Sequence, residues 1–135
     1  MIKGITFGVY DLLHLGHFKL FEKIKKNCDE LTVYVHDDIY NIKKKNFLYS
    51  LSQRMYLLDR IKTVDRVLPY TRVDVDIKNA NFDIFFIGQD QKNEYFLEAI
   101  EYARKNNKKI VEIKREPNIS SSFIKNIIEK STYHG

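Results

Sequence analysis

One cysteine, Cys28, and no tryptophan occur among the 135 residues of the chain. A single cysteine cannot form a disulfide within the chain or supply a cysteine cluster for zinc, which favours a reducing compartment. The sequence also lacks any apolar run near the ~20 residues that a membrane-spanning helix requires, and its first residues form a strand pattern and not a signal region. We therefore expect a cytoplasmic protein with no membrane partner.

Apolar and charged side chains are both plentiful, at 44% and 30% of the residues. The apolar share is sufficient for a hydrophobic core, and we expect residues 1–135 to form a single domain. The formal net charge of +5 favours anionic partners, among which are nucleic acid and phosphorylated metabolites. The aromatic residues fall mostly at core spacings and not on a basic stacking surface, so we expect no nucleic-acid partner.

Strand and helix patterns alternate along the chain, with no internal repeat or linker between them. Apolar runs predict strands at 2–7, 31–36, 66–68, 82–87 and 109–113. Helical periodicity predicts helices at 17–26, 51–62, 94–105 and 121–130, whereas 73–79 is compatible with a strand or a short helix and 41–46 with a loop. This alternation predicts an α/β fold, a doubly wound parallel sheet of about five strands with helices on both faces.

The sequence also predicts how two of the helices begin and pack. Ser50 followed by Gln53 matches a capping box, so the second helix should start directly after Ser50. The residues expected to face inward are, in the second helix, Tyr56, Leu57 and Ile61 and, in the helix over 94–105, Phe96, Leu97, Ile100 and Ala103.

Ligands of parallel sheets bind beyond the carboxyl ends of the strands, so the segment GVYDLLHLGH after the first strand is the main candidate site. Gly8 lets the chain turn and lets a ligand approach the backbone. His14 and His17 share a face at the start of the next helix, and Gly16 between them leaves room for a phosphate. The helix N-terminus adds N–H groups and positive dipole, which completes a cradle for a triphosphate.

Two other interpretations of this histidine pair remain open. The H-x-x-H spacing can chelate zinc, for which His36 or a carboxylate would have to supply a third ligand. The two histidines can also be ordinary residues with no ligand.

The segment GVYDLLHLGH resembles the H-x-G-H signature of the cytidylyltransferase-like nucleotidyltransferases. Within that superfamily the chain is most similar to the glycerol-3-phosphate cytidylyltransferases, over nearly its whole length. The resemblance implies a Rossmann-like nucleotidyltransferase fold, a homodimer and Mg²⁺ as cofactor. Class I aminoacyl-tRNA synthetases share the motif, but they need a far longer chain and a K-M-S-K-S loop. This sequence has neither, which disfavours that class.

The resemblance also implies roles for individual residues. The catalytic residues would be His14, His17, Lys44 and Arg115. The nucleotide would be bound by Gly8, Val9, Tyr10, Asp11, Gly16, Asp38, Lys62, Gly88, Ile119, Ser120, Ser121 and Ser122. The acceptor would be bound by Asp65, Gln89 and Asp90, and Asp11 would orient a histidine or hold the metal. Asp38 and Asp65 also have ordinary interpretations, as a cap and a surface residue.

The chain departs from the family pattern at three places: Lys62 stands for an arginine, Asn118 for a glycine, and Gly88-Gln89-Asp90-Gln91 for a G-D-D-W type segment. The last change removes a carboxylate and an indole from the expected rim of the site. A less acidic rim tolerates an acceptor with more negative charge, and the missing indole weakens a cation–π contact with a choline-like head.

The implied reaction is attack by a substrate phosphate on the α-phosphorus of CTP, with release of pyrophosphate. A phosphate monoester has a second pKa of about 6 and is already anionic at neutral pH, so no general base is required. Glycerol 3-phosphate, giving CDP-glycerol, is the expected acceptor. The alternatives are another phosphorylated polyol, phosphoethanolamine or phosphocholine, an inactive nucleotide-binding paralogue, and a nucleic-acid binder. Adenylyltransferases share the H-x-G-H core, so the residues alone do not decide between CTP and ATP.

Overall fold

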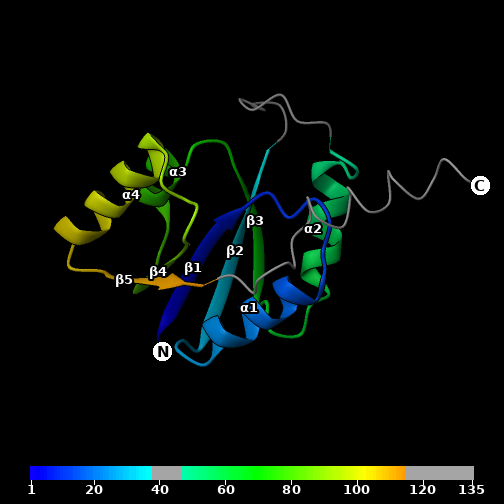
Figure 1. Ribbon diagram of the computed structural model, residues 1–135. Coiled ribbons are helices and arrows are strands. Elements are labelled where there is room, and N and C mark those ends of the chain that lie inside the picture. Colours follow the sequence, from blue (N-terminus) through cyan, green and yellow to red (C-terminus); the bar gives the residue numbers. More distant parts are fainter. Residues whose placement is uncertain (38–46, 115–135) are drawn as a thin grey trace, which may run out of the picture.

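The computed structural model describes residues 1–37 and 47–114, which form a parallel sheet covered by helices (Figure 1). Its strands are β1 (Lys3–Gly8), β2 (Glu30–His36), β3 (Arg66–Tyr70), β4 (Ile84–Gly88) and β5 (Lys109–Ile113). They are arranged in the order β3-β2-β1-β4-β5, and every neighbouring pair is parallel. The predicted α/β fold with a five-stranded parallel sheet is therefore confirmed.

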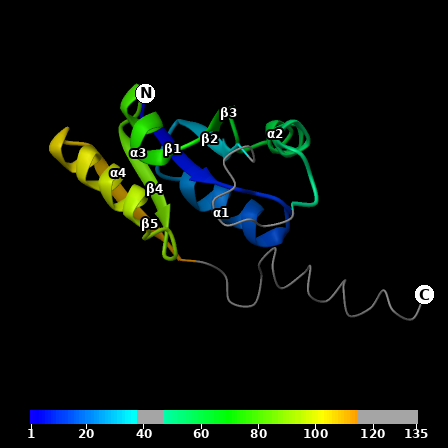
Figure 2. The same ribbon diagram turned by 90° about the horizontal axis from the view of Figure 1, so that it is seen from above.

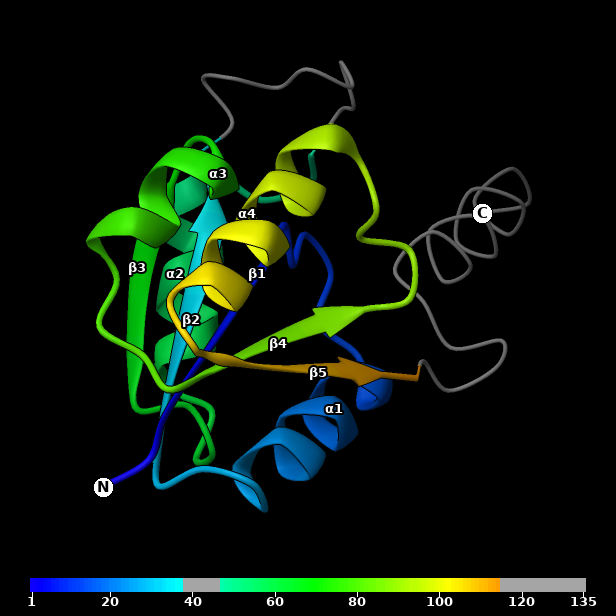
Figure 3. The ribbon, with the colours of Figure 1, turned by 90° about the vertical axis from the view of Figure 1, so that its left-hand side faces the viewer.

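Helices cover both faces of the sheet. The helices α1 (Leu15–Lys25) and α2 (Leu51–Asp59) pack on one face, while α3 (Val73–Asp76), the 3₁₀ turn η2 (Ile77–Asn79) and α4 (Glu94–Lys105) pack on the other. Figures 2 and 3 show α1 and α4 on opposite sides of the sheet. None of the helices in the described ranges is both long and apolar enough to cross a membrane.

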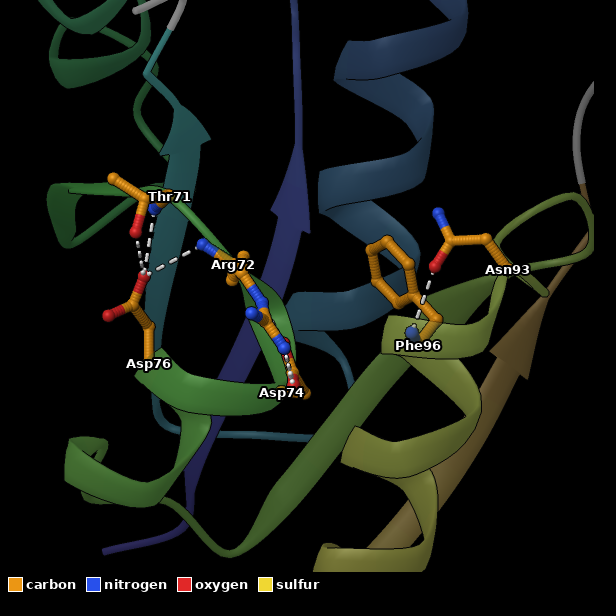
Figure 4. Close-up of polar contacts among 6 residues, drawn as sticks. All are labelled: Thr71, Arg72, Asp74, Asp76, Asn93 and Phe96. Atoms are coloured by element: carbon orange, nitrogen blue, oxygen red, sulfur yellow. Dashed lines mark hydrogen bonds and ion pairs between the residues drawn. The ribbon is translucent and has the colours of Figure 1, made fainter. Parts of the chain in front are cut away.

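The ambiguous segment 73–79 is helical. The carboxylate of Asp76 accepts a hydrogen bond from the N–H of Thr71 at 2.8 Å, which closes the turn between β3 and α3 (Figure 4). Val73 and Ile77 then face the sheet together and are almost fully buried, because they are four residues apart on one side of a helix. The alternation of apolar and polar residues in 73–79, which is also compatible with a strand, therefore belongs to a short helical segment. This segment packs two apolar side chains on the sheet.

Several predicted boundaries are wrong. The helix α1 begins at Leu15 and not at 17, and β4 begins at Ile84 and not at 82. The strand β3 continues through Pro69 to Tyr70, where Pro69 is paired with Val35 of β2. A proline is tolerated there because β3 is an edge strand and the missing N–H removes no hydrogen bond on its outer side. The helix α2 ends at Asp59, not near Lys62, and a tight turn through Ile61 and Val64 leads into β3.

Three of the residues predicted to face inward are exposed: Tyr56 (57%), Leu57 (37%) and Leu97 (53%). In α2 the buried residues are Arg54 and Leu58, and in α4 they are Phe96, Ala99, Ile100 and Ala103. The helix α2 packs mainly on β2 and the edge strand β3, so it buries a narrow stripe. A stripe through 54, 58 and 61 leaves 56 and 57 on the outer side of the helix.

An aromatic layer joins four strands just below the carboxyl ends of the sheet. The ring of Phe7 stacks on Tyr34 with centroids 4.4 Å apart, and it meets Tyr70 and Phe85 edge-on at 4.9 and 5.7 Å. Each such pair contributes about 0.5–1.5 kcal/mol beyond the area it buries. The loops that follow β1, β2, β3 and β4 therefore start from a rigid base.

Candidate active site

The loop after β1 turns sharply at Tyr10. This residue has a φ of 55°, in the left-handed region that bulky side chains rarely adopt, and its ring is buried above Gly8. A Cβ on Gly8 would lie 2.7 Å from Cζ of that ring, so only glycine fits. Burial also raises the pKa of the Tyr10 hydroxyl well above its ordinary value, so this side chain is neutral. Gly8 thus makes room for Tyr10, a role that the sequence did not indicate.

His14 and His17 meet at the N-terminus of α1. The Nδ1 atom of His14 accepts a hydrogen bond from the N–H of Gly16 at 3.0 Å, and Nδ1 of His17 accepts one from the N–H of His14 at 3.3 Å. This arrangement is a capping box built from two histidines, whose ring centroids lie 4.0 Å apart. Because both Nδ1 atoms are acceptors, each neutral ring carries its proton on Nε2. Both imidazoles therefore have an Nε2–H donor in a fixed orientation.

Asp11 connects this loop to the segment before α2. Its carboxylate is buried and accepts hydrogen bonds from the N–H groups of Leu48 and Tyr49, at 2.9 and 3.0 Å. Residues 1–37 and 47–114 contain no group of three His, Cys, Asp or Glu that could hold an ion. A magnesium ion at Asp11 would thus take most of its ligands from substrate phosphates and water, which is common for Mg²⁺.

Arg54 joins three segments of the site, although it is not among the residues to which the family resemblance gives a role. Its Nη1 donates to the carbonyl oxygens of Val9 and His36, both at 2.9 Å, and its Nε donates to that of Tyr49 at 3.2 Å. The guanidinium also lies over the ring of Phe47, 4.9 Å from its centroid. The side chain is fully buried, and its hydrogen bonds offset the cost of burying a charge. The available signal was its position four residues before Leu58, on the buried face of α2.

The turn after β4 lies beside the end of β1, where the strand order of the sheet changes direction. Gln89 and Asp90 are exposed on this turn, at the carboxyl edge where the sequence predicted them. The carboxamide of Gln91 lies further in: its Oε1 accepts from the N–H of Gly88 at 2.9 Å, and its Nε2 donates to the carbonyl of Phe7. In sheets of this kind the ligand crevice lies at this switch point.

Lys62 and Asp65 are not brought together with these residues. The connection from α2 to β3 lies at the amino edge of the sheet, and there the Asp65 carboxylate accepts from Lys25 Nζ and from the N–H of Leu31. Partial burial raises the pKa of Asp65, but these two hydrogen bonds and the charge of Lys25 outweigh it and lower the pKa below its usual range. The parallel order of the strands places this turn opposite the histidines, so neither a nucleotide-binding role for Lys62 nor an acceptor-binding role for Asp65 agrees with the geometry.

The remaining predicted residues fall outside the described ranges. They are Asp38, Lys44, Arg115, Ile119, Ser120, Ser121 and Ser122, together with the loop over 41–46 and the helix over 121–130.

Beyond β3, an ion pair lies at the start of α3 (Figure 4). The Arg72 guanidinium contacts both oxygens of Asp74, at 3.1 and 2.6 Å, and lies 4.4 Å from the centroid of Tyr95. The hydrogen bond from Arg72 is the main reason that the pKa of Asp74 is lowered. Nearby, Asn93 caps α4 by accepting the N–H of Phe96 at 3.0 Å. The contact of Arg72 with Tyr95 therefore joins the start of α3 to α4, while Asp74 neutralises the charge of Arg72.

Two imidazoles on a helix N-terminus, at the switch point of a parallel sheet, form a site suited to a nucleotide triphosphate. A sequence profile of the cytidylyltransferase-like family matches residues 5–127. The chain belongs to this family and is a nucleotidyltransferase.

Individual relatives carry different names. The chain is 35% identical over 130 residues to glycerol-3-phosphate cytidylyltransferase of Bacillus subtilis strain 168, covering 93% of this chain and 95% of the relative. It is 36% identical over 140 residues to an FAD synthase of Thermoplasma volcanium, covering 96% of each. A crystal structure described as a lipopolysaccharide core biosynthesis protein from Thermoplasma volcanium superposes with a TM-score of 0.70 at 28% identity, covering 86% of this chain and 97% of that one. Overall similarity therefore defines the fold and the reaction class but not the substrate.

Proposed function

We propose that the chain transfers a cytidylyl group from CTP to a phosphorylated small alcohol, with glycerol 3-phosphate as the first candidate, and releases pyrophosphate. The observation that carries the proposal is the histidine capping box of α1, in which both Nδ1 atoms accept backbone hydrogen bonds. The similarity to glycerol-3-phosphate cytidylyltransferase, which extends over 93% of this chain, supports CTP and this acceptor.

In the proposed reaction an oxygen of the acceptor phosphate attacks the α-phosphorus of CTP. The bond from that phosphorus to the oxygen bridging to the β-phosphate breaks, and pyrophosphate leaves with the electron pair. The nucleophile is already anionic, so the enzyme supplies positioning and charge stabilisation instead of a base. The Nε2–H groups of His14 and His17 donate to phosphate oxygens as negative charge develops on them.

The N–H groups at the start of α1, next to Gly16, add a second set of donors to the triphosphate. Lys44 and Arg115 are proposed to close over the phosphates, and Ser120, Ser121 and Ser122 to bind them from the last helix. Mg²⁺ is proposed as the cofactor, held by Asp11 and the substrate phosphates, and would neutralise charge on the leaving pyrophosphate.

Gln89 and Asp90 are proposed to contact the acceptor from the exposed turn after β4. One carboxylate at this rim, instead of two, favours an acceptor whose only charges are negative. The rim has no indole to hold a quaternary ammonium group. Phosphocholine is therefore expected to be a poor substrate beside glycerol 3-phosphate.

The second candidate is synthesis of FAD by adenylyl transfer from ATP to FMN, which the similarity to an FAD synthase supports. A pyrophosphate-release assay separates the two. Purified protein is incubated with each of CTP, ATP, GTP and UTP against glycerol 3-phosphate, phosphocholine, phosphoethanolamine and FMN, and products are identified by mass spectrometry. CDP-glycerol is the expected product. FAD formed from ATP would replace the first candidate by the second, and no turnover with any pair would indicate an inactive paralogue.

The proposal includes one domain, expected from the length and composition of the chain, and a homodimer, taken from the resemblance to the family. Light scattering at micromolar concentration is expected to give twice the monomer mass of 16.1 kDa. A monomer mass would contradict the proposed homodimer but would not contradict the proposed reaction.

A further inference from the structure

The sheet opens between β1 and β4 at its carboxyl edge. The pairing of β1 with β2 extends to Gly8 and Val35, and that of β4 with β5 extends to Gly88 and Ile113. Between β1 and β4, pairing stops earlier, at Thr6 and Phe86. Figure 3 shows β4 turning away from β1 over the same stretch. The two central strands therefore separate about two residues before they end, and they do so at the switch point.

The Gln91 carboxamide fills the position of the next hydrogen bond in this ladder. With the observed register, Phe7 would face Ile87, and the N–H of Gly88 would donate to the carbonyl of Phe7. Instead, Gly88 N–H donates to Oε1 of Gln91 at 2.9 Å, and Nε2 of Gln91 donates to the Phe7 carbonyl. Donor and acceptor of the missing bond are both satisfied by one side-chain amide.

The local turn brings Gln91 to this place. Its backbone N–H donates to the carbonyl of Gly88 at 3.2 Å, which closes a turn with Gln89 and Asp90 at its tip. A Cβ on Gly88 would lie 3.2 Å from Oδ1 of Asp90 and 3.7 Å from Oε1 of Gln91, so glycine keeps the turn close to the strand. The inserted group must donate on one side and accept on the other, which a carboxamide does and a carboxylate does not.

We propose that Gln91 is a positioning residue for nucleotidyl transfer, which holds the ends of β1 and β4 apart at the crevice between them. This inference rests on the proposed function, because it assumes that the nucleotide lies in that crevice. Gln91 acts through its two partners: Phe7 leads into the loop that carries the histidines, and Gly88 starts the turn that carries Gln89 and Asp90. The spacing between the two halves of the site depends on the inserted amide.

Two variants test this directly. Gln91→Met keeps the length of the side chain and removes both hydrogen bonds. Gln91→Glu keeps its shape and one acceptor, but at neutral pH it places a carboxylate oxygen against the Phe7 carbonyl. The matched control is Asn106→Asp, because the Asn106 amide also donates to a backbone carbonyl, that of Tyr102 at 2.8 Å, at the opposite end of α4.

At neutral pH, kcat is expected to fall at least about tenfold in both Gln91 variants, with a smaller change in KM, and to stay unchanged in Asn106→Asp. Lower pH should restore Gln91→Glu, since a protonated glutamic acid donates to Phe7 and accepts from Gly88 as the amide does. Its kcat relative to the unaltered protein should therefore rise between about pH 8 and pH 5, above the usual glutamate pKa of about 4.3 because the facing carbonyl oxygen disfavours the anion. Gln91→Met should show no such recovery. Asp90, Tyr10 and the Lys92–Glu112 ion pair are the same in all variants, so taking the ratio to the unaltered protein isolates the effect of residue 91.

A second measurement does not depend on activity. Hydrogen exchange followed by NMR should show protection of the Gly88 amide in the unaltered protein, loss of that protection in Gln91→Met, and its return in Gln91→Glu at low pH. If the unaltered protein is inactive with every nucleotide and acceptor, the proposed function is refuted. Protection of the Gly88 amide would then still show whether the Gln91 side chain accepts its hydrogen bond. Full activity of Gln91→Met in an active enzyme, or an unprotected Gly88 amide in the unaltered protein, would overturn the inference.

Discussion

The N–H of His14 donates a hydrogen bond to Nδ1 of His17 at 3.3 Å, so one histidine of the site orients the ring of the other. The bond from Gly16 to Nδ1 of His14 completes the pair. Both rings are held by the backbone of the helix whose N-terminus they occupy. The same two residues therefore cap α1, and each neutral ring carries its proton on Nε2.

This double role predicts that stability and catalysis separate at position 14. His14→Ala should lower kcat roughly 100-fold and also reduce the free energy of unfolding by about 1 kcal/mol, through loss of the donor and of the helix cap. His14→Ser should recover the stability, because serine is a good N-cap, without recovering kcat. Urea denaturation and pyrophosphate release measure the two effects.

His17→Ala should lower kcat by a similar factor with the fold intact, since it also removes a preorganised donor. Near-wild-type turnover in both His14→Ala and His17→Ala would contradict the proposed mechanism.

Arg54→Met should reduce the free energy of unfolding by about 3 kcal/mol. The variant leaves the carbonyl oxygens of Val9, His36 and Tyr49 without the donors they now have, and each buried unsatisfied acceptor costs about 1–3 kcal/mol. The control is Arg60→Met at the C-cap of the same helix, because Arg60 is exposed and its loss should change stability by less than about 1 kcal/mol. Equal midpoints in urea for the two variants would show that Arg54 does not hold the loops together.

Asp65→Asn should reduce stability at pH 7 and leave turnover unchanged. The pKa of Asp65 is lower in the folded protein, so its contribution is present above the ordinary value of 3.8 and is lost as the pH falls through the folded value. The variant and the unaltered protein should therefore become equally stable well below pH 4. The effect at pH 7 should be small because the side chain is 38% exposed and screened by solvent. A large fall in kcat would instead support the acceptor-binding role that the family resemblance implies for Asp65.

Removal of divalent metal should stop the reaction, and added Mg²⁺ should restore it. The charge on the leaving pyrophosphate is otherwise neutralised only by protein donors. Turnover in the presence of a chelator is the measurement, with Asp11→Asn as the matched variant. This variant keeps the shape of the side chain but removes its charge and turns one of the two acceptors of the Leu48 and Tyr49 N–H groups into a donor. It should therefore raise the Mg²⁺ concentration needed for half-maximal rate, and its stability in urea is measured beside it. Undiminished activity in the presence of the chelator would show that the reaction does not require a divalent metal.

Much of the architecture follows from contacts between residues close in sequence. The capping box of Ser50 and Gln53 is present as predicted, with bonds of 3.2 and 3.0 Å, because both partners belong to one helical turn. The helix at Glu94–Lys105 and the strand at Lys109–Ile113 have the predicted boundaries. The histidine pair at the start of α1 is equally local. Periodicity and spacing are sufficient for such features, since the local backbone geometry alone decides which side chains meet.

The tertiary structure decided what lies between these elements. Asp11 meets Leu48 across 37 residues, Arg54 meets Val9 across 45, and Gln91 meets Phe7 across 84. No local pattern marks such pairs, because they depend on which strands become neighbours and where a ladder stops. The same order of strands placed Lys62 and Asp65 at the edge opposite the histidines. The sequence by itself determined the elements and the reaction class, while the arrangement of the parallel strands decided which predicted residues share a site, because only strand ends at the same edge of the sheet lie close together.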